Sequence, residues 1–145
     1  MTTQKLIHQF VSLIPDDLDE NKLYISMEYS TVAHKCACGC GEEVTIPLSP
    51  TDWKLEFDGA TVTLWPSIGN WSFACRSHYW IKSNRICWDE KWSDEKIQHS
   101  RMADKILKSD YYQNELSEDV IGYESDEIEV SVWESFRRYF GWEYR

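Results

Sequence analysis

Three cysteines and a histidine alternate within one short stretch, His34-Lys-Cys36-Ala-Cys38-Gly-Cys40-Gly. In an extended chain alternate residues point to the same side, so His34, Cys36 and Cys38 can share a face. The glycines on either side of Cys40 let the backbone curl, so that this fourth side chain can turn inward as well. The stretch can therefore aim several thiolate and imidazole groups at one point.

A second cluster, Cys75-Arg-Ser77-His78, lies further along the chain. Cys75 and His78 offer a thiolate and an imidazole three positions apart, a spacing that one turn can direct to a single point. Two ligand groups separated by a long segment are the usual way to build a tetrahedral zinc site, and a mixed sulfur and nitrogen set suits zinc. The sequence therefore predicts bound Zn²⁺. Which four residues bind it stays open among the candidate ligands Cys36, Cys38, Cys40, Cys75 and His78.

Buried small side chains and disulfides are the alternatives for these cysteines. Cysteines two apart on a strand cannot easily bridge, because their side chains run parallel. Residues 1–8 lack an apolar run of signal-peptide length, so we expect a cytoplasmic protein, in which disulfides are disfavoured. The odd number of cysteines also leaves one unpaired. Cys87 has no ligand-like neighbour and is predicted to pack in the core.

A zinc site can be structural, with four protein ligands, or catalytic, with a position left open for water. In a catalytic site a carboxylate must take the proton of the water, and Glu28, just before the cysteine stretch, is the candidate base. His34 is the second candidate, and Ser77 could donate to an oxyanion. Glu28 could equally be a surface residue. A cysteine–histidine nucleophile pair is a third possibility.

The composition limits the class of protein and of partner. With 145 residues the chain suits one domain. A formal charge of −10 argues against binding to nucleic acid, which calls for a basic surface. No stretch is long and apolar enough to span a bilayer, so no membrane partner is expected.

The hydrophobic pattern predicts an α+β fold, with a small, mostly antiparallel β core that carries the zinc site, followed by C-terminal helices. We expect a single domain over residues 1–145, composed of a β-rich zinc-binding core (1–90) and an acidic helical extension (91–145). Short alternating runs predict strands, and these runs are Lys22–Tyr29, Glu43–Pro47, Trp53–Phe57, Thr61–Trp65, His78–Lys82 and Arg85–Trp88.

Turn and helix signals complete the expected fold. Asp58-Gly59 between two alternating runs predicts a hairpin, and residues 66–71 read as a loop. Ser93 is a predicted helix N-cap, followed by apolar residues at helical spacing. Residues 110–134 contain no lysine or arginine and read as a solvated connector, and a short last helix is expected around residues 133–140.

Several motifs, in order, resemble a bacterial family, the domain-of-unknown-function 6527 family. They are Glu28-Tyr29, Ala33-His34-x-Cys36-x-Cys38-Gly-Cys40-Gly, Pro47-Leu-Ser-Pro50-Thr51-x-Trp53, Phe57-Asp58-Gly59, Pro66-Ser-Ile-Gly-Asn-Trp71 and Cys75-x-Ser77-His78-Tyr-Trp-Ile81. Members of this family are often encoded beside ubiquitin-like, E1-like and E2-like proteins in predicted phage-defence operons, and are regarded as predicted zinc peptidases. The resemblance covers roughly residues 20–85. The chain departs from the family at Ala37, where many relatives carry proline.

The resemblance implies a zinc-dependent peptidase that processes or removes the C-terminal tail of a ubiquitin-like protein, with E1-like and E2-like proteins as further partners. The alternative is a non-enzymatic zinc module that docks components of the conjugation pathway through aromatic surface residues. An open zinc position beside a groove would favour the peptidase, whereas a buried four-ligand site would favour the docking module.

Overall fold

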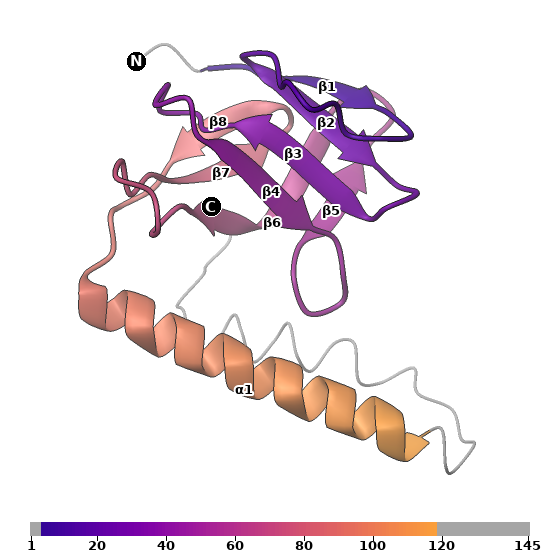
Figure 1. Cartoon of the computed structure of the whole chain (residues 1–145), viewed down its shortest axis with the longest axis vertical. Coiled ribbons are helices and arrows are strands. Elements are labelled where there is room, and N and C mark those ends of the chain that lie inside the picture. Colours follow the sequence, from indigo (N-terminus) through magenta and orange to yellow (C-terminus); the bar gives the residue numbers. More distant parts are fainter. Residues whose placement is uncertain (1–3, 119–145) are drawn as a thin grey trace. The chain divides into compact units, whose positions relative to one another are not determined.

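A computed structural model describes residues 4–118 of the chain, which form eight strands and one helix (Figure 1). The elements in chain order are β1 (Ile7–Phe10), β2 (Lys22–Ser26), β3 (Thr31–Lys35), β4 (Glu43–Pro47), β5 (Lys54–Phe57), β6 (Val62–Gly69), β7 (His78–Lys82), β8 (Arg85–Trp88) and α1 (Asp94–Glu118). The predicted strands are confirmed: β4, β7 and β8 have the predicted bounds, β2 and β5 are shorter at one end, and β6 begins one residue later and extends further.

The strands form two sheets of four, in the orders β1-β2-β3-β4 and β5-β6-β7-β8. Every pairing is antiparallel except that of β1 with β2, which is parallel. Neighbouring strands in each sheet follow one another along the chain, and short turns of two to eight residues connect the antiparallel ones. The predicted small, mostly antiparallel β core is confirmed.

The two sheets enclose one hydrophobic core (Figure 1). Its fully buried members come from both sheets and include Leu23, Ile25 and Val32 on one side and Leu64 and Ile81 on the other. Backbone bridges join the sheets at two places: Lys5 pairs with Arg85, and Leu48 pairs with Trp53. The core and these bridges fix the positions of β3, β6 and β7 relative to one another. The reactive side chains described below lie on these strands or next to them.

Strand β6 is irregular where it passes β7. Leu64 pairs with Ile81 and Ile68 pairs with Tyr79, so three residues of β6, Trp65 to Ser67, lie opposite Trp80 alone. Pro66 has no N–H and cannot take part in a regular ladder, which accounts for a bulge at this position. The prediction of a loop over residues 66–71 is wrong for its first four residues, because β6 continues through the bulge to Gly69.

Helix α1 begins where the sequence predicts it and ends later. The hydroxyl of Ser93 accepts a hydrogen bond from the backbone N–H of Lys96 at 3.3 Å, which is the predicted N-cap. The helix then continues through Asp110 to Glu118, where a connector was expected. In the described part of the chain α1 is the only helix, so the prediction of several helices is not met there. The short helix expected around residues 133–140 lies outside the described residues.

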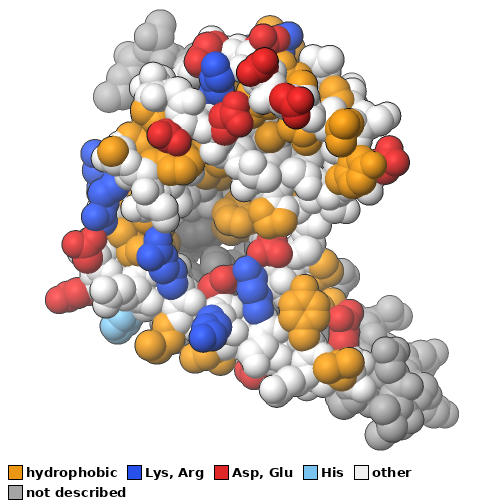
Figure 2. Space-filling view, in the orientation of Figure 1, with side chains coloured by type: hydrophobic (Ala, Val, Ile, Leu, Met, Phe, Trp, Pro, Cys, Tyr) orange, Lys and Arg blue, Asp and Glu red, His pale blue; other side chains and the backbone are white. Residues whose placement is uncertain are grey.

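The chain divides into two compact units, Met1–Ile97 and Gln98–Arg145, and the first turn of α1 belongs to the first. Acidic side chains are spread over the visible face of the sheets (Figure 2), in keeping with the formal charge of −10. Within residues 4–118, no helix is both long enough and apolar enough to cross a membrane.

The predicted hairpin between β5 and β6 gives a first test of the fold. Gly59 has a φ of +93°, and the space around its Cα is open. A β-branched side chain is disfavoured at such a φ by about 1–2 kcal/mol. We expect Gly59→Val to lower the free energy of unfolding by about this amount in denaturant titrations. Ala60→Val, at the next exposed position, is the matched control and should change it little; equal effects would contradict the assigned turn.

Candidate active site and cysteine group

Ser67 lies in the β6 bulge, and its hydroxyl is within hydrogen-bond distance of His78. The Ser67 Oγ lies 2.9 Å from Nε2 of His78, and both residues are more than nine-tenths buried. The two residues come together because Gly69 pairs with His78 in the β6–β7 ladder, and the bulge turns Ser67 toward the same imidazole. A serine hydroxyl on a histidine nitrogen is the arrangement of a nucleophile with its general base.

The other ring nitrogen of His78 fixes the tautomer. Nδ1 lies 2.6 Å from the backbone carbonyl oxygen of Glu90, which can only accept a hydrogen bond. Nδ1 must therefore carry the proton, and in the neutral ring Nε2 is left with a lone pair directed at Ser67. This is the protonation state in which His78 can accept the hydroxyl proton of Ser67.

Two tryptophans and a carboxylate surround the imidazole. The rings of Trp71 and Trp92 lie 5.0 and 5.1 Å from that of His78, measured between centroids, and limit its rotation. The Oδ2 of Asp89 lies 3.9 Å from Nε2 and accepts a hydrogen bond from the indole N–H of Trp80 at 2.9 Å. The carboxylate thus lies beside the same ring nitrogen that faces Ser67.

Four cysteine sulfurs gather at a separate place, between the turn after β3 and the loop before β7. Cys36, Cys38, Cys40 and Cys75 have their Sγ atoms within 4.8 Å of one another, a group that could hold a metal ion. Separations of 3.4, 3.8 and 3.9 Å are found between pairs of these sulfurs. A tetrahedral Zn²⁺ with Zn–S bonds of about 2.3 Å requires sulfurs about 3.8 Å apart, so the donors fit this metal.

The cysteine stretch is curled rather than extended. Strand β3 ends at Lys35, and the following turn bends at Gly39 and Gly41, whose φ angles are +83° and +86°. The prediction that glycines would let Cys40 turn inward is confirmed, whereas the predicted extended strand through Cys36 and Cys38 is wrong. These positive φ angles fold the turn back so that its sulfurs converge.

The thiols differ in acidity within the group. Burial and hydrogen bonds with Cys40 and Cys36 raise the pKa of Cys38 to about 12. Burial also acts to raise the pKa of Cys75, but hydrogen bonds with Ser77 and with the neighbouring thiols outweigh it and lower this pKa to about 7. Cys75 is thus prepared to become a thiolate, the form in which cysteine binds a metal.

The Ser77 hydroxyl makes its hydrogen bonds in the cysteine group, although Ser77 directly precedes His78 in the chain. Its Oγ lies 3.1 Å from Sγ of Cys36 and accepts a hydrogen bond from the side-chain amide of Asn70 at 2.9 Å. The hydroxyl can therefore donate its proton to the sulfur. The predicted oxyanion donor thus lies against the sulfur of Cys36, and contacts of this type orient metal ligands in general.

The histidine of the cysteine stretch faces the core. His34 is fully buried, and its Nε2 lies 2.8 Å from the hydroxyl of Tyr79, while Nδ1 has no partner within residues 4–118. Burial lowers its pKa to about 4, so the fold holds the neutral ring. The stability that depends on this is fully present above pH 6.5 and is lost as the pH falls toward 4.

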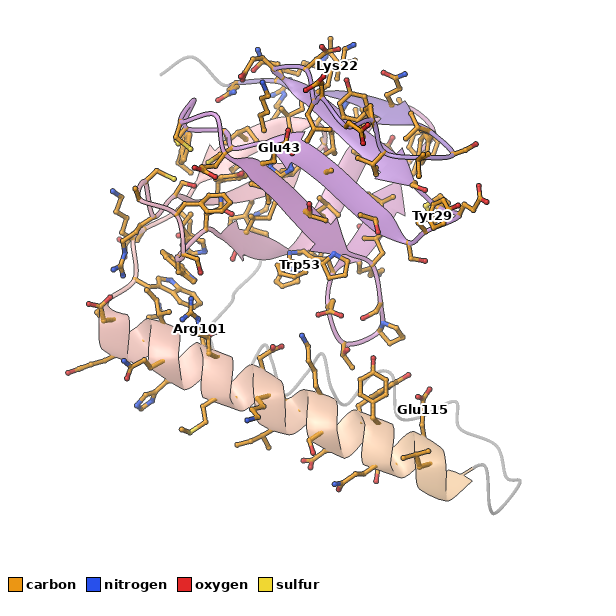
Figure 3. The ribbon with its side chains drawn as sticks, in the orientation of Figure 1. Lys22, Tyr29, Glu43, Trp53, Arg101 and Glu115 are labelled. Carbon is orange, nitrogen blue, oxygen red and sulfur yellow. The ribbon has the colours of Figure 1, made fainter. Side chains whose placement is uncertain are left out.

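Glu28 lies away from the cysteine group. It is exposed in the turn between β2 and β3, and all of β3 separates this turn from Cys36. Figure 3 labels its neighbour Tyr29 and also Glu43, which begins β4 after the cysteine turn, at opposite ends of the sheet. Five residues of strand span about 16 Å, too far for a carboxylate to take a proton from a group held by the cysteines.

His78 and Ser67 were not linked by sequence reasoning. His78 was predicted as a metal ligand, but the structure places both of its nitrogens on Ser67 and Glu90, and the group of four sulfurs does not include it. Ser67 was overlooked because the segment around Pro66 read as a loop. Its place in one of the motifs that carry the family resemblance, Pro66-Ser-Ile-Gly-Asn-Trp71, was the available signal.

Comparison with protein families matches residues 10–89, more than half of the chain, to the bacterial ubiquitination-like system serine protease family, BubE. The chain belongs to this family. The curated proteins and the solved structures gave no match. The description of BubE supports the prediction of a peptidase in a ubiquitin-like pathway, and the domain-of-unknown-function designation stays a prediction.

The predicted zinc-dependent mechanism is wrong, because the BubE family is one of serine proteases. The role given to Glu28 as the base for zinc-bound water falls with that mechanism. The BubE family does not favour the alternative of a non-enzymatic docking module either. Instead, the Ser67–His78 pair supplies the groups that a serine protease needs.

The contact between Tyr79 and His34 gives a second test. Tyr79→Phe removes the hydroxyl on Nε2 and leaves a buried imidazole without a partner on either nitrogen. We expect the free energy of unfolding to fall by about 1–3 kcal/mol. Tyr24→Phe is the control, because its hydroxyl bonds the exposed Asp19, and it should cost less. The contact would be disproved if the two variants unfold alike.

Proposed function

We propose that this chain is a serine protease that acts on the ubiquitin-like protein of its own system, with Ser67 as the nucleophile and His78 as the general base. The observation that carries the proposal is the 2.9 Å contact between Ser67 Oγ and Nε2 of a histidine whose Nδ1 is bound to a carbonyl. Membership of the BubE family supports both the type of reaction and the pathway.

The steps follow from the geometry. His78 accepts the proton of Ser67 as Oγ attacks the peptide carbonyl, and the resulting imidazolium lies between the Glu90 carbonyl and the Asp89 carboxylate. The same proton is then given to the amine that leaves as the peptide bond breaks. Water hydrolyses the acyl-serine by the same route, which returns Ser67 and His78 to their starting states. Trp71 and Trp92 keep the imidazole aligned throughout.

The four cysteines would hold one Zn²⁺, which fits their spacing and thiolate chemistry. With all four positions taken by protein, the metal would be structural and would tie the turn after β3 to the loop before β7. In this role it supports the segment that leads into His78. The E1-like and E2-like proteins of the system are further proposed partners.

The test of the enzyme uses the cognate ubiquitin-like protein with a reporter fused to its C-terminus. Ser67→Ala should abolish cleavage and labelling by a fluorophosphonate, and His78→Gln should lower the cleavage rate by about 10²–10⁴-fold. Circular dichroism at the assay temperature should show that both variants are folded. Glu28→Gln is the control for the discarded mechanism and should cleave at the parent rate. Wild-type cleavage by Ser67→Ala would refute the proposal.

The metal is tested by elemental analysis and thermal melting. About one zinc should copurify with each chain, and Cys36→Ser and Cys75→Ser should each lose it and melt at a lower temperature, because metal binding and folding are coupled. Cys87→Ser, on β8 and outside the group of four, should retain zinc. Full zinc content in Cys36→Ser and Cys75→Ser would show that these residues are not ligands.

A further inference from the structure

The strand that carries Ser67 has an open edge. Strand β5 pairs with β6 only from Val62 to Trp65, although β6 continues to Gly69. The chain before β5 turns away: the N–H of Trp53 donates to the carbonyl of Pro47, and its carbonyl accepts from the N–H of Ser49. Trp53, labelled in Figure 3, is thereby engaged with the end of β4. The second half of β6 is left without a neighbour on that side among the described strands.

The backbone of Gly69 faces this open edge. In an antiparallel ladder, residues alternate between those that bond the neighbouring strand and those that point away from it. The N–H of Asn70 donates to the carbonyl of Ser77, so Gly69, one residue earlier and level with His78, directs its N–H and C=O away from β7. Neither group has a backbone partner within residues 4–118.

The residue at this position must lack a side chain. A Cβ on Gly69 would overlap the indole of Trp71, which lies over the strand and against His78. The edge is thus occupied by the bare backbone of a half-buried glycine, two residues from the nucleophile, with one donor and one acceptor directed away from β7. An extended peptide offers the complementary acceptor and donor in each second residue.

We propose that the substrate binds as an added strand, antiparallel to the open edge of β6 and in line with β5. This proposal rests on the proposed function and names how that site recognises its substrate: by the backbone of an extended, flexible tail rather than by a folded surface. Gly69 forms two hydrogen bonds with a single substrate residue, its N–H to that residue's carbonyl and its carbonyl to that residue's N–H.

The register of this pairing follows from the position of Ser67. The substrate residue whose carbonyl is attacked lies level with Ser67. Because the strands are antiparallel, the residue opposite Gly69 comes two positions earlier in the substrate, which makes it the third residue before the cut. The N–H of the second residue before the cut points to the opposite side, away from β6.

The experiment changes the substrate, so that the fold of the full-length protease is not at risk. The probe is a short peptide spanning the cut that mass spectrometry locates in the cleaved fusion protein. In one variant an ester oxygen replaces the N–H of the third residue before the cut. In the matched control the same replacement is made at the second residue. Cleavage at the original bond is followed by mass spectrometry, with the Ser67→Ala chain as blank.

We expect the ester at the third residue to lower kcat/KM by about three- to tenfold, because one hydrogen bond to Gly69 is lost, and the control to change it by less than about twofold. Equal effects at both positions, or the larger effect at the second, would overturn the strand proposal while leaving the serine protease in place.

A fall in activity per chain as the enzyme concentration rises would mean that a second copy of the protease occupies the edge of β6. This result would also overturn the strand proposal. If Ser67 does not cleave the unmodified peptide or the fusion protein, the proposed function fails and the strand proposal falls with it.

Discussion

The register between β6 and β7 is the constraint on which both chemical groups depend. Side chains on a strand alternate between its faces, so neighbouring residues around the start of β7 serve different purposes. Ser77 and Tyr79 contact the cysteine group and the buried His34, whereas His78 between them faces Ser67. A slip of one residue would exchange these faces and disable both groups at once. The shared core and the bulge opposite Trp80 hold the pairing in place.

Much of the fold could be predicted because its signals are local. Alternation and turn residues sufficed for β4, β7 and β8, whose observed bounds match those predicted, and Asp58-Gly59 marked the hairpin. Ser93 marked the start of α1. The convergence of the cysteines also followed from spacing and from the glycines among them, since a short curled segment brings its own side chains together whatever the rest of the chain does.

The pair at the candidate active site could not be predicted in this way. Ser67 meets His78 only because two strands pair, and no rule of spacing connects a residue in a bulge with one at the start of the next strand. Pro66 also made a strand read as a loop. The spacing of Cys75 and His78 misled for a related reason: the turn directs Cys75 toward the other sulfurs, and β7 then points His78 the opposite way. Proximity in sequence was taken for proximity in space.

The hydrogen-bond partner of His78 Nδ1 is a main-chain carbonyl, and this affects which substitutions and which pH changes the site can tolerate. A carboxylate in that place would be a side chain, which one substitution could remove and which acid could neutralise. The Glu90 carbonyl is supplied by whatever residue occupies the position, and it does not titrate. The path of the backbone after β8 therefore fixes the orientation of the imidazole. Residue 90 can be substituted without loss of this contact. A three-residue signature of serine, histidine and acid would not describe this site, because the backbone after β8 supplies the group that holds Nδ1.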